Sequence, residues 1–395
     1  MTRVSMIPPV HGSVRLTEEQ VLLRDAVRVL ADEQIAPRAA DIDRAAEWPE
    51  DIRRLLADHD ILAIPFAERH GGLGGDLLTL CLAIEAISRH CATSGLILAV
   101  QALGAVPIQV AGTPEQQDRW LPGLASGDRL IAFGLTEADA GSDPSGIRTR
   151  AVRDGDDYVI DGTKRFISHG SVADYVVVFA VTNPDAEKPS RRLSAIVVET
   201  DRPGFKVTRL EHKMGIRGSP TAELAFDGVR VPVANRLGEE GQGFGIAMQT
   251  FERSRPGIAA QAVGIAQGAL EVAARHANER RQFGKPIGEL QMVQAMLADM
   301  DASTEAARHL LYTACQEIEA GAPDAARWAA ISKLVAGDAA MRVTTDAVQV
   351  LGGYGYIDEY PVERMMRDAK ITQLYEGTQQ IQRLIVARAL LARSS

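Results

Sequence analysis

The chain has 395 residues, 46% of them hydrophobic, and a formal net charge of −9 at pH 7. This length can bury a sizeable core and predicts two or three domains. The acidic balance argues against a broad nucleic-acid or anionic-membrane surface. The three cysteines form no CxxC pair, so we expect buried thiols, a reducing compartment and a cytoplasmic protein. The histidines follow no ligand spacing, so no metal site is expected.

Residues 1–128 predict an N-terminal helical domain. Residues 1–15 contain no apolar core of the length that a secretory signal needs. Thr17 and Gln20 form a capping-box pattern before a helix that continues to Leu30. Shorter helices are expected over 52–59, 76–89 and 115–124. Residues 91–114 lack charged side chains, and their glycine, proline and glutamine residues favour a buried helix pair over a membrane span.

Residues 129–240 predict a central β domain, either a sandwich or a barrel, because turn residues recur every eight to fifteen positions. Asp161 and Gly162 separate two short strand patterns, 158–160 and 164–167, and indicate a hairpin turn. Apolar strands over 175–181 and 193–198 follow, and then strands over 206–210 and 222–226. Asp227 and Gly228 indicate another turn.

Residues 241–395 predict a C-terminal helical bundle. Long helical patterns cover 257–282, 290–319 and 325–350, which is typical of a four-helix bundle. The glycine-rich stretch 352–356 interrupts the pattern before the last helices. The whole chain is therefore expected to be an α+β multidomain protein.

One acid, Glu376, lies on a short turn between an amphipathic basic segment and a helical pattern that begins at Ile381. A carboxylate kept away from bulk water has a raised pKa and makes a competent general base near neutral pH. Gly377 allows a backbone or a ligand to approach closely. Taken alone, these residues are more typical of a solvated turn than of a catalytic site.

The stretch 375–383, preceded by Met-Arg-Asp-Ala-Lys at 366–370, resembles the C-terminal signature of the acyl-CoA dehydrogenases. In that family the matching glutamate removes the α-proton of the substrate, so the resemblance implies that Glu376 is the catalytic base. The order of a helical, a β and a second helical block is also that of the family. The resemblance extends over essentially the full chain and implies FAD as the cofactor.

The segment 133–143 contains Thr-Glu-x-x-x-Gly-Ser-Asp and resembles the N-terminal motif of the family. Without the resemblance it is an ordinary loop rich in hydrogen-bond donors. The resemblance implies that Phe133, Leu135 and Thr136 contact the flavin ring. Ser142 is implied to bind both the cofactor and the thioester. Ala138 replaces the usual proline, which affects the rigidity of the loop.

Residues 166–168 resemble the family segment that covers the flavin. Phe166 stands where tryptophan is more common, Ile167 follows it, and Ser168 keeps a hydroxyl group that is implied to reach N5. A donor at N5 favours the negative charge that arrives with the hydride.

Arg280 lies in a motif that resembles the family's R-x-x-F-G-K and is implied to bind the FAD pyrophosphate of a neighbouring subunit. The planar guanidinium suits phosphate because it donates two hydrogen bonds at once. The other implied cofactor contacts are Gln282, Phe283, Gln291, Gln349, Gly352, Gly353, Thr378 and Gln380. A site shared between subunits implies an oligomer, and the family is usually a homotetramer built as a dimer of dimers.

Residues 251–256 resemble the segment that meets the CoA part of the substrate. Glu252, in place of a frequent aspartate, and Arg255 are therefore implied substrate contacts, together with Ser142 and Gly377. Position 254 is serine, so the alternative base that some long- and branched-chain members place near there is absent. Glu376 is then the sole candidate base.

The resemblance implies the FAD-dependent α,β-dehydrogenation of an acyl-CoA to a trans-2-enoyl-CoA, as in fatty acid β-oxidation. Electrons would pass to an electron-transferring flavoprotein. Within the same fold, the alternatives are an acyl-CoA oxidase, an enzyme acting on a carrier-protein-bound acyl thioester, and a flavin-binding, DNA-associated stress protein. The net charge of −9 argues against the last of these. A nicotinamide dehydrogenase is disfavoured because no GxGxxG follows a strand. Acyl chain length would depend on scattered apolar side chains within 77–98 and 243–249.

Overall fold

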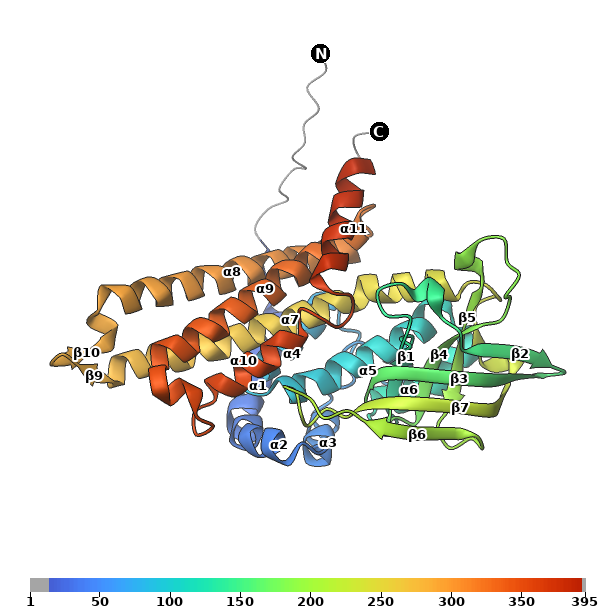
Figure 1. Cartoon of the computed structure of the whole chain (residues 1–395), viewed down its shortest axis with the longest axis horizontal. Coiled ribbons are helices and arrows are strands. Elements are labelled where there is room, and N and C mark those ends of the chain that lie inside the picture. Colours follow the sequence, from blue (N-terminus) through green and yellow to red (C-terminus); the bar gives the residue numbers. More distant parts are fainter. Residues whose placement is uncertain (1–13, 393–395) are drawn as a thin grey trace, which may run out of the picture.

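The computed structural model describes residues 14–392, so most of the segment predicted to lack a secretory signal lies outside the described residues. Helices come first, then strands, and then helices again, in three blocks along the chain (Figure 1). This arrangement confirms the predicted α+β multidomain fold.

The N-terminal block consists of helices packed around an apolar core. Their bounds are α1 Glu18–Leu30, α2 Ala39–Ala45, α3 Glu50–Asp58, α4 Leu77–Ser88, α5 Ala92–Ala111 and α6 Pro114–Ala125. The predicted capping box at the start of α1 is confirmed. The backbone N–H of Gln20 donates to the Thr17 hydroxyl, and the Thr17 N–H donates to the Gln20 side chain, both at 3.1 Å.

The helix pair expected over 91–114 is wrong, because this stretch forms the single helix α5. Pro107 lies inside it, where a proline removes one backbone hydrogen bond but need not end the helix when the surroundings hold it. Gly104 marks a close approach and not a break, since a Cβ there would lie 2.7 Å from the Ile131 side chain. Within residues 14–392, α5 and the later helix α7 (Gly243–Glu279) are long and apolar enough to span a membrane, but 83% and 78% of their apolar windows are buried, as in core helices.

The middle block is an eight-stranded sheet with the order β6-β7-β3-β2-β4-β5-β8 and with β1 beside β4. The strands are β1 Ile131–Gly134, β2 Arg150–Asp154, β3 Asp157–Ser168, β4 Tyr175–Val181, β5 Leu193–Glu199, β6 Phe205–Leu210, β7 Thr221–Pro232 and β8 Arg236–Leu237. Strands β2 and β4 pair only at Arg150 and Val181, so the sheet divides there into two layers. Strand β4 is buried on both faces, with Phe179 in the core shared with the helices and Val178 in the core shared with β3 and β7. The result is a sandwich.

Both predicted Asp-Gly turns in this block are wrong. Strand β3 runs through Asp161 and Gly162, where the register against β7 shifts, and β7 runs through Asp227 and Gly228. The two pairs face each other, and the Gly228 N–H donates to the Asp161 carboxylate at 2.8 Å. Glycine is common both at strand irregularities and in turns. An Asp-Gly pair in the sequence therefore does not show which of these structures forms. The real turn between β2 and β3 is at Gly155, whose φ is 63°.

The C-terminal block is built on α7 Gly243–Glu279, α8 Gln291–Glu319, α9 Ala325–Leu351 and α10 Val362–Ile371, followed by α11 Gln379–Ala392. Helices α7, α8, α9 and α10 pack side by side, and α11 leaves the bundle near the C-terminus (Figure 1). Helix α7 ends three residues before the predicted position, and the short strands β9 Arg281–Gln282 and β10 Lys285–Pro286 follow. The predicted break at 352–356 is confirmed as a short 3-10 helix.

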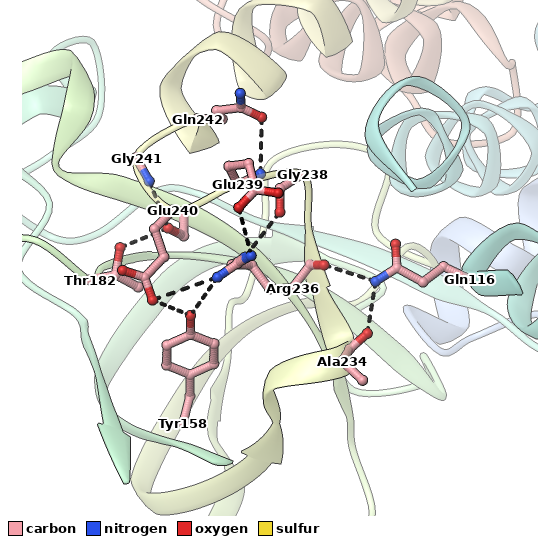
Figure 2. A network of polar contacts seen from close by, with 11 residues as sticks. Gln116, Tyr158, Thr182, Ala234, Arg236, Gly238, Glu239, Glu240, Gly241 and Gln242 are labelled. Carbon is pink, nitrogen blue, oxygen red and sulfur yellow. Dashed lines mark hydrogen bonds and ion pairs between the residues drawn. The ribbon is translucent and has the colours of Figure 1, made fainter. Parts of the chain in front are cut away.

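A polar network joins the β block to the start of α7 (Figure 2). Arg236 donates to the Gly238 carbonyl at 3.0 Å and to the Tyr158 hydroxyl at 3.2 Å, and it pairs with Glu239 at 3.1 Å. The Tyr158 hydroxyl in turn donates to Glu240 at 2.5 Å. Because Tyr158 belongs to β3, the network sets the direction in which α7 leaves the sheet.

Helix α4 packs very closely on α7. A Cβ at Gly264 would lie 2.4 Å from the Glu85 carbonyl oxygen, and one at Gly268 would lie 2.0 Å from the Arg89 carbonyl oxygen. Only glycine permits this approach, because any side chain would meet the backbone of α4. The contact places α4 beside the helix that carries Ser254 and Arg255.

Candidate active site

Glu376 lies in the turn between α10 and α11, where the backbone is left-handed at two successive residues. The φ angles are 52° at Glu376 and 93° at Gly377. A non-glycine residue in this region costs about 1–2 kcal/mol, so the surroundings must hold it. The Glu376 carbonyl accepts from Arg255 Nε at 3.3 Å and from Gln382 Nε2 at 3.2 Å. The Gly377 carbonyl accepts from Gln382 Nε2 at 2.9 Å and from Lys333 Nζ at 2.7 Å.

Gly377 also makes room for one of these groups. A Cβ at this position would lie 2.8 Å from the Gln382 side-chain nitrogen, and Gln382 is fully buried. The close approach predicted for Gly377 is therefore to a side-chain amide that supports the turn.

The Glu376 carboxylate is partly buried and receives a hydrogen bond from the Ser254 hydroxyl at 2.5 Å. Burial raises the pKa of Glu376, and the Ser254 hydrogen bond and the charges of Arg255 and Lys333 oppose that rise. The raised pKa expected from the sequence is confirmed in direction. A carboxylate of this kind can take up a proton near neutral pH.

Ser254 also lines a cavity of about 380 Å³ between α4, α5 and α7. This volume lies within the range of small-molecule pockets. The apolar part of its wall includes Leu77, Leu80, Ile84, Ala99, Ala102, Leu103, Val106 and Gly257. Only part of the prediction for this wall is confirmed, because Leu77, Leu80 and Ile84 line it but no residue of 243–249 does. Helix α7 contributes instead near Ser254, because its side chains there turn toward α4 and α5.

The two segments implied to contact the flavin ring lie side by side. The Arg165 N–H donates to the Thr136 carbonyl at 2.9 Å, which joins the 133–143 loop to the end of β3. Phe166 has a left-handed φ of 58° and a 56% exposed ring. A large exposed aromatic in a strained conformation indicates a binding surface. Thr136 and Ser168, which carry the predicted hydroxyls, are both half-buried.

The other residues of these segments have different surroundings. Leu135 and Ile167 are buried in the core, whereas Ser142 is exposed on the loop. Phe133 packs against Phe251 of α7 with ring centroids 5.5 Å apart. The aromatic contact connects the loop to the helix that carries Ser254.

A buried ion pair between Lys164 and Glu137 holds the 133–143 loop against β3. The Lys164 ammonium has no exposed surface, and it donates to Glu137 at 2.8 Å and to the Leu135 carbonyl at 3.0 Å. The backbone N–H groups of Arg148 and Thr149 donate to the same Glu137 carboxylate at 2.8 and 3.0 Å. Burial lowers the pKa of Lys164 to about 8, although the adjacent Glu137 opposes this shift.

A second cluster lies at the other end of α7. Arg280, Gln282, Gly352 and Gly353 line a cavity of about 460 Å³. Neither glycine has an atom within 4 Å of the position a Cβ would take, so the backbone is open to a ligand. The remaining predicted cofactor residues near this end, Phe283, Gln291 and Gln349, are exposed. In the turn that carries Glu376, Thr378 caps α11 through the Ile381 N–H at 3.4 Å, and Gln380 is exposed.

The structure does not bring the two clusters together within one chain. At 1.5 Å per residue, about 40 Å of helix separates Phe251 from the end of α7 at Glu279. The β9–β10 hairpin and the β sheet lie at opposite ends of the molecule (Figure 1).

Of the predicted substrate contacts near Glu376, Arg255 supports the turn that carries it. Arg255 is buried over the Phe251 ring at 5.3 Å, and Glu252 is half-buried, which raises its pKa. The sequence analysis missed Lys333, Gln382 and the Glu137–Lys164 pair. A single lysine within the apolar stretch of α9 was the one available signal for Lys333.

Comparison with known proteins identifies the family. The chain matches the acyl-CoA dehydrogenase N-terminal domain over residues 17–128, the middle domain over 132–229 and the C-terminal domain over 241–391. It therefore belongs to the acyl-CoA dehydrogenases, which are FAD-dependent oxidoreductases that act on CH–CH bonds. The chain is an acyl-CoA dehydrogenase and FAD is its cofactor.

Individual relatives agree with this assignment. The short-chain-specific acyl-CoA dehydrogenase of Clostridium acetobutylicum is 46% identical over 376 residues, which cover 94% of this chain and 98% of the relative. Butyryl-CoA dehydrogenase of Megasphaera elsdenii superposes with a TM-score of 0.92 at 43% identity and covers 96% and 100% of the two chains. A chain solved in work on the electron transferring flavoprotein of Acidaminococcus fermentans superposes with a TM-score of 0.94 at 44% identity. The match covers 96% of this chain and 100% of that chain.

The two clusters fit FAD in their chemistry. Arg280, Gln282 and the open backbone at Gly352 and Gly353 present the donors that a pyrophosphate needs. At the other end, the exposed Phe166 ring and the adjacent hydroxyls suit a flat ring with several acceptors.

We predict that Glu137→Gln loosens the flavin loop. The substitution leaves the Lys164 ammonium buried without an anion, which should lower the free energy of unfolding by about 3–5 kcal/mol. Thermal unfolding of the FAD-loaded protein and the amount of FAD released measure the effect. Asp139→Asn is the matched control, because the Asp139–Arg148 pair on the same loop is exposed and 3.5 Å long. Equal unfolding midpoints for the two variants would contradict the structural role of the pair.

Proposed function

We propose that Glu376 is the base that removes the α-proton of an acyl-CoA thioester, which yields a trans-2-enoyl-CoA. The observation that supports this role is a carboxylate of raised pKa that accepts a hydrogen bond from Ser254, a residue that lines the cavity between α4, α5 and α7. The bound flavin supplies the electron chemistry by accepting the β-hydrogen with its electron pair. The acyl chain enters the cavity between α4, α5 and α7.

The turn also offers a donor for the thioester. Within residues 14–392 no hydrogen bond from the Glu376 backbone N–H is present. We infer that this N–H binds the thioester carbonyl, where it stabilises the negative charge that develops as the α-proton leaves. Ser254 orients the carboxylate, and the left-handed backbone brings the N–H and the carboxylate to the same substrate.

We predict that Glu376→Gln keeps FAD but loses flavin reduction by acyl-CoA, by about 10²- to 10⁴-fold, because the amide cannot accept the proton. Anaerobic stopped-flow bleaching of the flavin measures this rate. In the unsubstituted enzyme the rate should fall as pH drops through the raised pKa of Glu376, since only the carboxylate acts as base.

Glu115→Gln is the control, because Glu115 is an exposed acid in the first turn of α6. This variant should bleach at the unsubstituted rate. If Glu376→Gln also bleached at that rate, Glu376 would not be the base.

We propose further that each FAD is bound between two subunits of a homotetramer, built as a dimer of dimers. The support is the separation of the two clusters along α7, which is longer than an extended dinucleotide. Arg280 of one subunit would then bind the pyrophosphate of an FAD whose ring lies against Phe166 and Glu376 of another. A two-fold symmetric pair of subunits satisfies this arrangement, because each subunit gives one cluster to its partner and receives the other.

Co-expression of Glu376→Gln and Arg280→Met chains tests this arrangement. Each variant alone should be inactive. A mixed pair has one intact site, formed by Glu376 of one chain and Arg280 of the other, so the mixture should recover about a quarter of the unsubstituted activity. A mixture with no more activity than the two separate variants would place both clusters in one subunit.

We infer that the electron acceptor is an electron-transferring flavoprotein, supported by the family and by the similarity to the chain from the Acidaminococcus fermentans work. Turnover of acyl-CoA should depend on added electron-transferring flavoprotein, with little hydrogen peroxide formed in air. Peroxide in the same amount as the enoyl product would instead identify an oxidase.

The cysteines Cys81, Cys91 and Cys315 are free and buried, which supports a cytoplasmic, reducing location.

A further inference from the structure

Lys333 of α9 has no exposed surface, and it lies beneath the catalytic turn. Its ammonium donates to the Gly377 carbonyl at 2.7 Å, and the Gln379 side-chain oxygen lies 3.5 Å away. Lysine is almost never fully buried without a partner, because the ammonium loses its hydration. The contact it makes is to the residue directly after the proposed base.

Hydrogen bonds join the turn to α9 before and after the Lys333–Gly377 contact. Gln373, before Glu376, donates to Asp338 at 2.7 Å, and Gln379, after it, donates to the same carboxylate at 2.9 Å. Gly337 lets the turn approach, since a Cβ there would lie 3.1 Å from the Thr372 carbonyl oxygen. Lys333 reaches the middle of the turn between these two hydrogen bonds.

The charges around Lys333 come from three elements. Glu376 faces it from the turn, Arg255 from α7 and Asp338 from its own helix. Burial lowers the pKa of Lys333 to about 7, and the negative charge of Glu376 opposes this shift. In return, the Lys333 charge lowers the pKa of Glu376. Each group therefore stabilises the charged form of the other.

We propose that Lys333 is a positioning residue for the dehydrogenation: its ammonium holds the Gly377 carbonyl so that Glu376 keeps its left-handed conformation, and its charge keeps the Glu376 carboxylate ionised. This inference rests on the proposed role of Glu376 as base. Without Lys333, the partners that remain among residues 14–392 are the Gln382 amide for the Gly377 carbonyl and the Arg255 cation for the Glu376 carboxylate.

Lys333→Met removes both effects and should lower kcat by about 10- to 100-fold through misplacement of the base, with little change in KM. Because a nearby positive charge is lost, the pKa of Glu376 should rise further, and the acidic limb of the kcat/KM profile should move to higher pH. Lys333→Gln keeps a hydrogen-bond donor but no charge. It should therefore recover part of kcat, while the acidic limb of the kcat/KM profile stays at the higher pH. Lys206→Met removes an exposed lysine of β6 and is the control, with no change expected.

The double variant Glu376→Gln with Lys333→Met separates this role from others. Since Lys333 acts through Glu376, the second substitution should lower the residual bleaching rate no further. The proposal would be overturned if Lys333→Met lowered the bleaching rate by the same factor with and without Glu376→Gln. It would also be overturned if the acidic limb of the pH profile did not move in either Lys333 variant. Failure of both neutral variants to hold FAD would overturn it as well, because Lys333 would then be needed for folding alone. Full activity in Glu376→Gln by itself would instead reject the proposed base.

Discussion

The site depends on one constraint: a carboxylate must be kept partly out of water on a turn whose backbone is left-handed at two consecutive residues. Such a turn is unstable alone, because a glutamate in this conformation costs about 1–2 kcal/mol. Groups from three helices hold it, namely Arg255 of α7, Lys333 of α9 and Gln382 of α11. All three donate to the backbone carbonyls of Glu376 and Gly377, whereas the Glu376 carboxylate accepts from the Ser254 hydroxyl.

The length of α7 connects the other features of the molecule. At its start the helix is held against the sheet by the Arg236 network, and near its middle Gly264 and Gly268 admit α4. Ser254, between these regions, touches both the Glu376 carboxylate and the cavity. At its far end, Arg280 begins the second cluster. One long helix thus sets the distance between the cluster at Arg280 and the one at Phe166.

The flavin side of the site depends on a buried charge. Lys164 and Glu137 pair beneath the 133–143 loop, where neither would be stable without the other. The pair therefore holds the loop against β3, the strand that carries the exposed Phe166. Burial in this case stabilises a loop, whereas at Glu376 it also raises the pKa of a carboxyl group.

Local chemistry in the sequence was enough to predict the start of α1, the order of the three blocks and the family to which the chain belongs. The capping box at Thr17 and the break at 352–356 involve only neighbouring residues, and the motif around Glu376 is contiguous. The Asp-Gly pairs could not be assigned, because glycine serves a bulge as well as a turn, and the choice depends on pairing between β3 and β7. Lys333 and Glu376 are 43 positions apart, and the cavity wall combines α4, α5 and α7, so only packing brings these groups together. The strand pairing, the Lys333–Glu376 proximity and the cavity wall were decided by the tertiary structure alone. Burial and the approach of a charge are properties of the folded chain and not of any one segment.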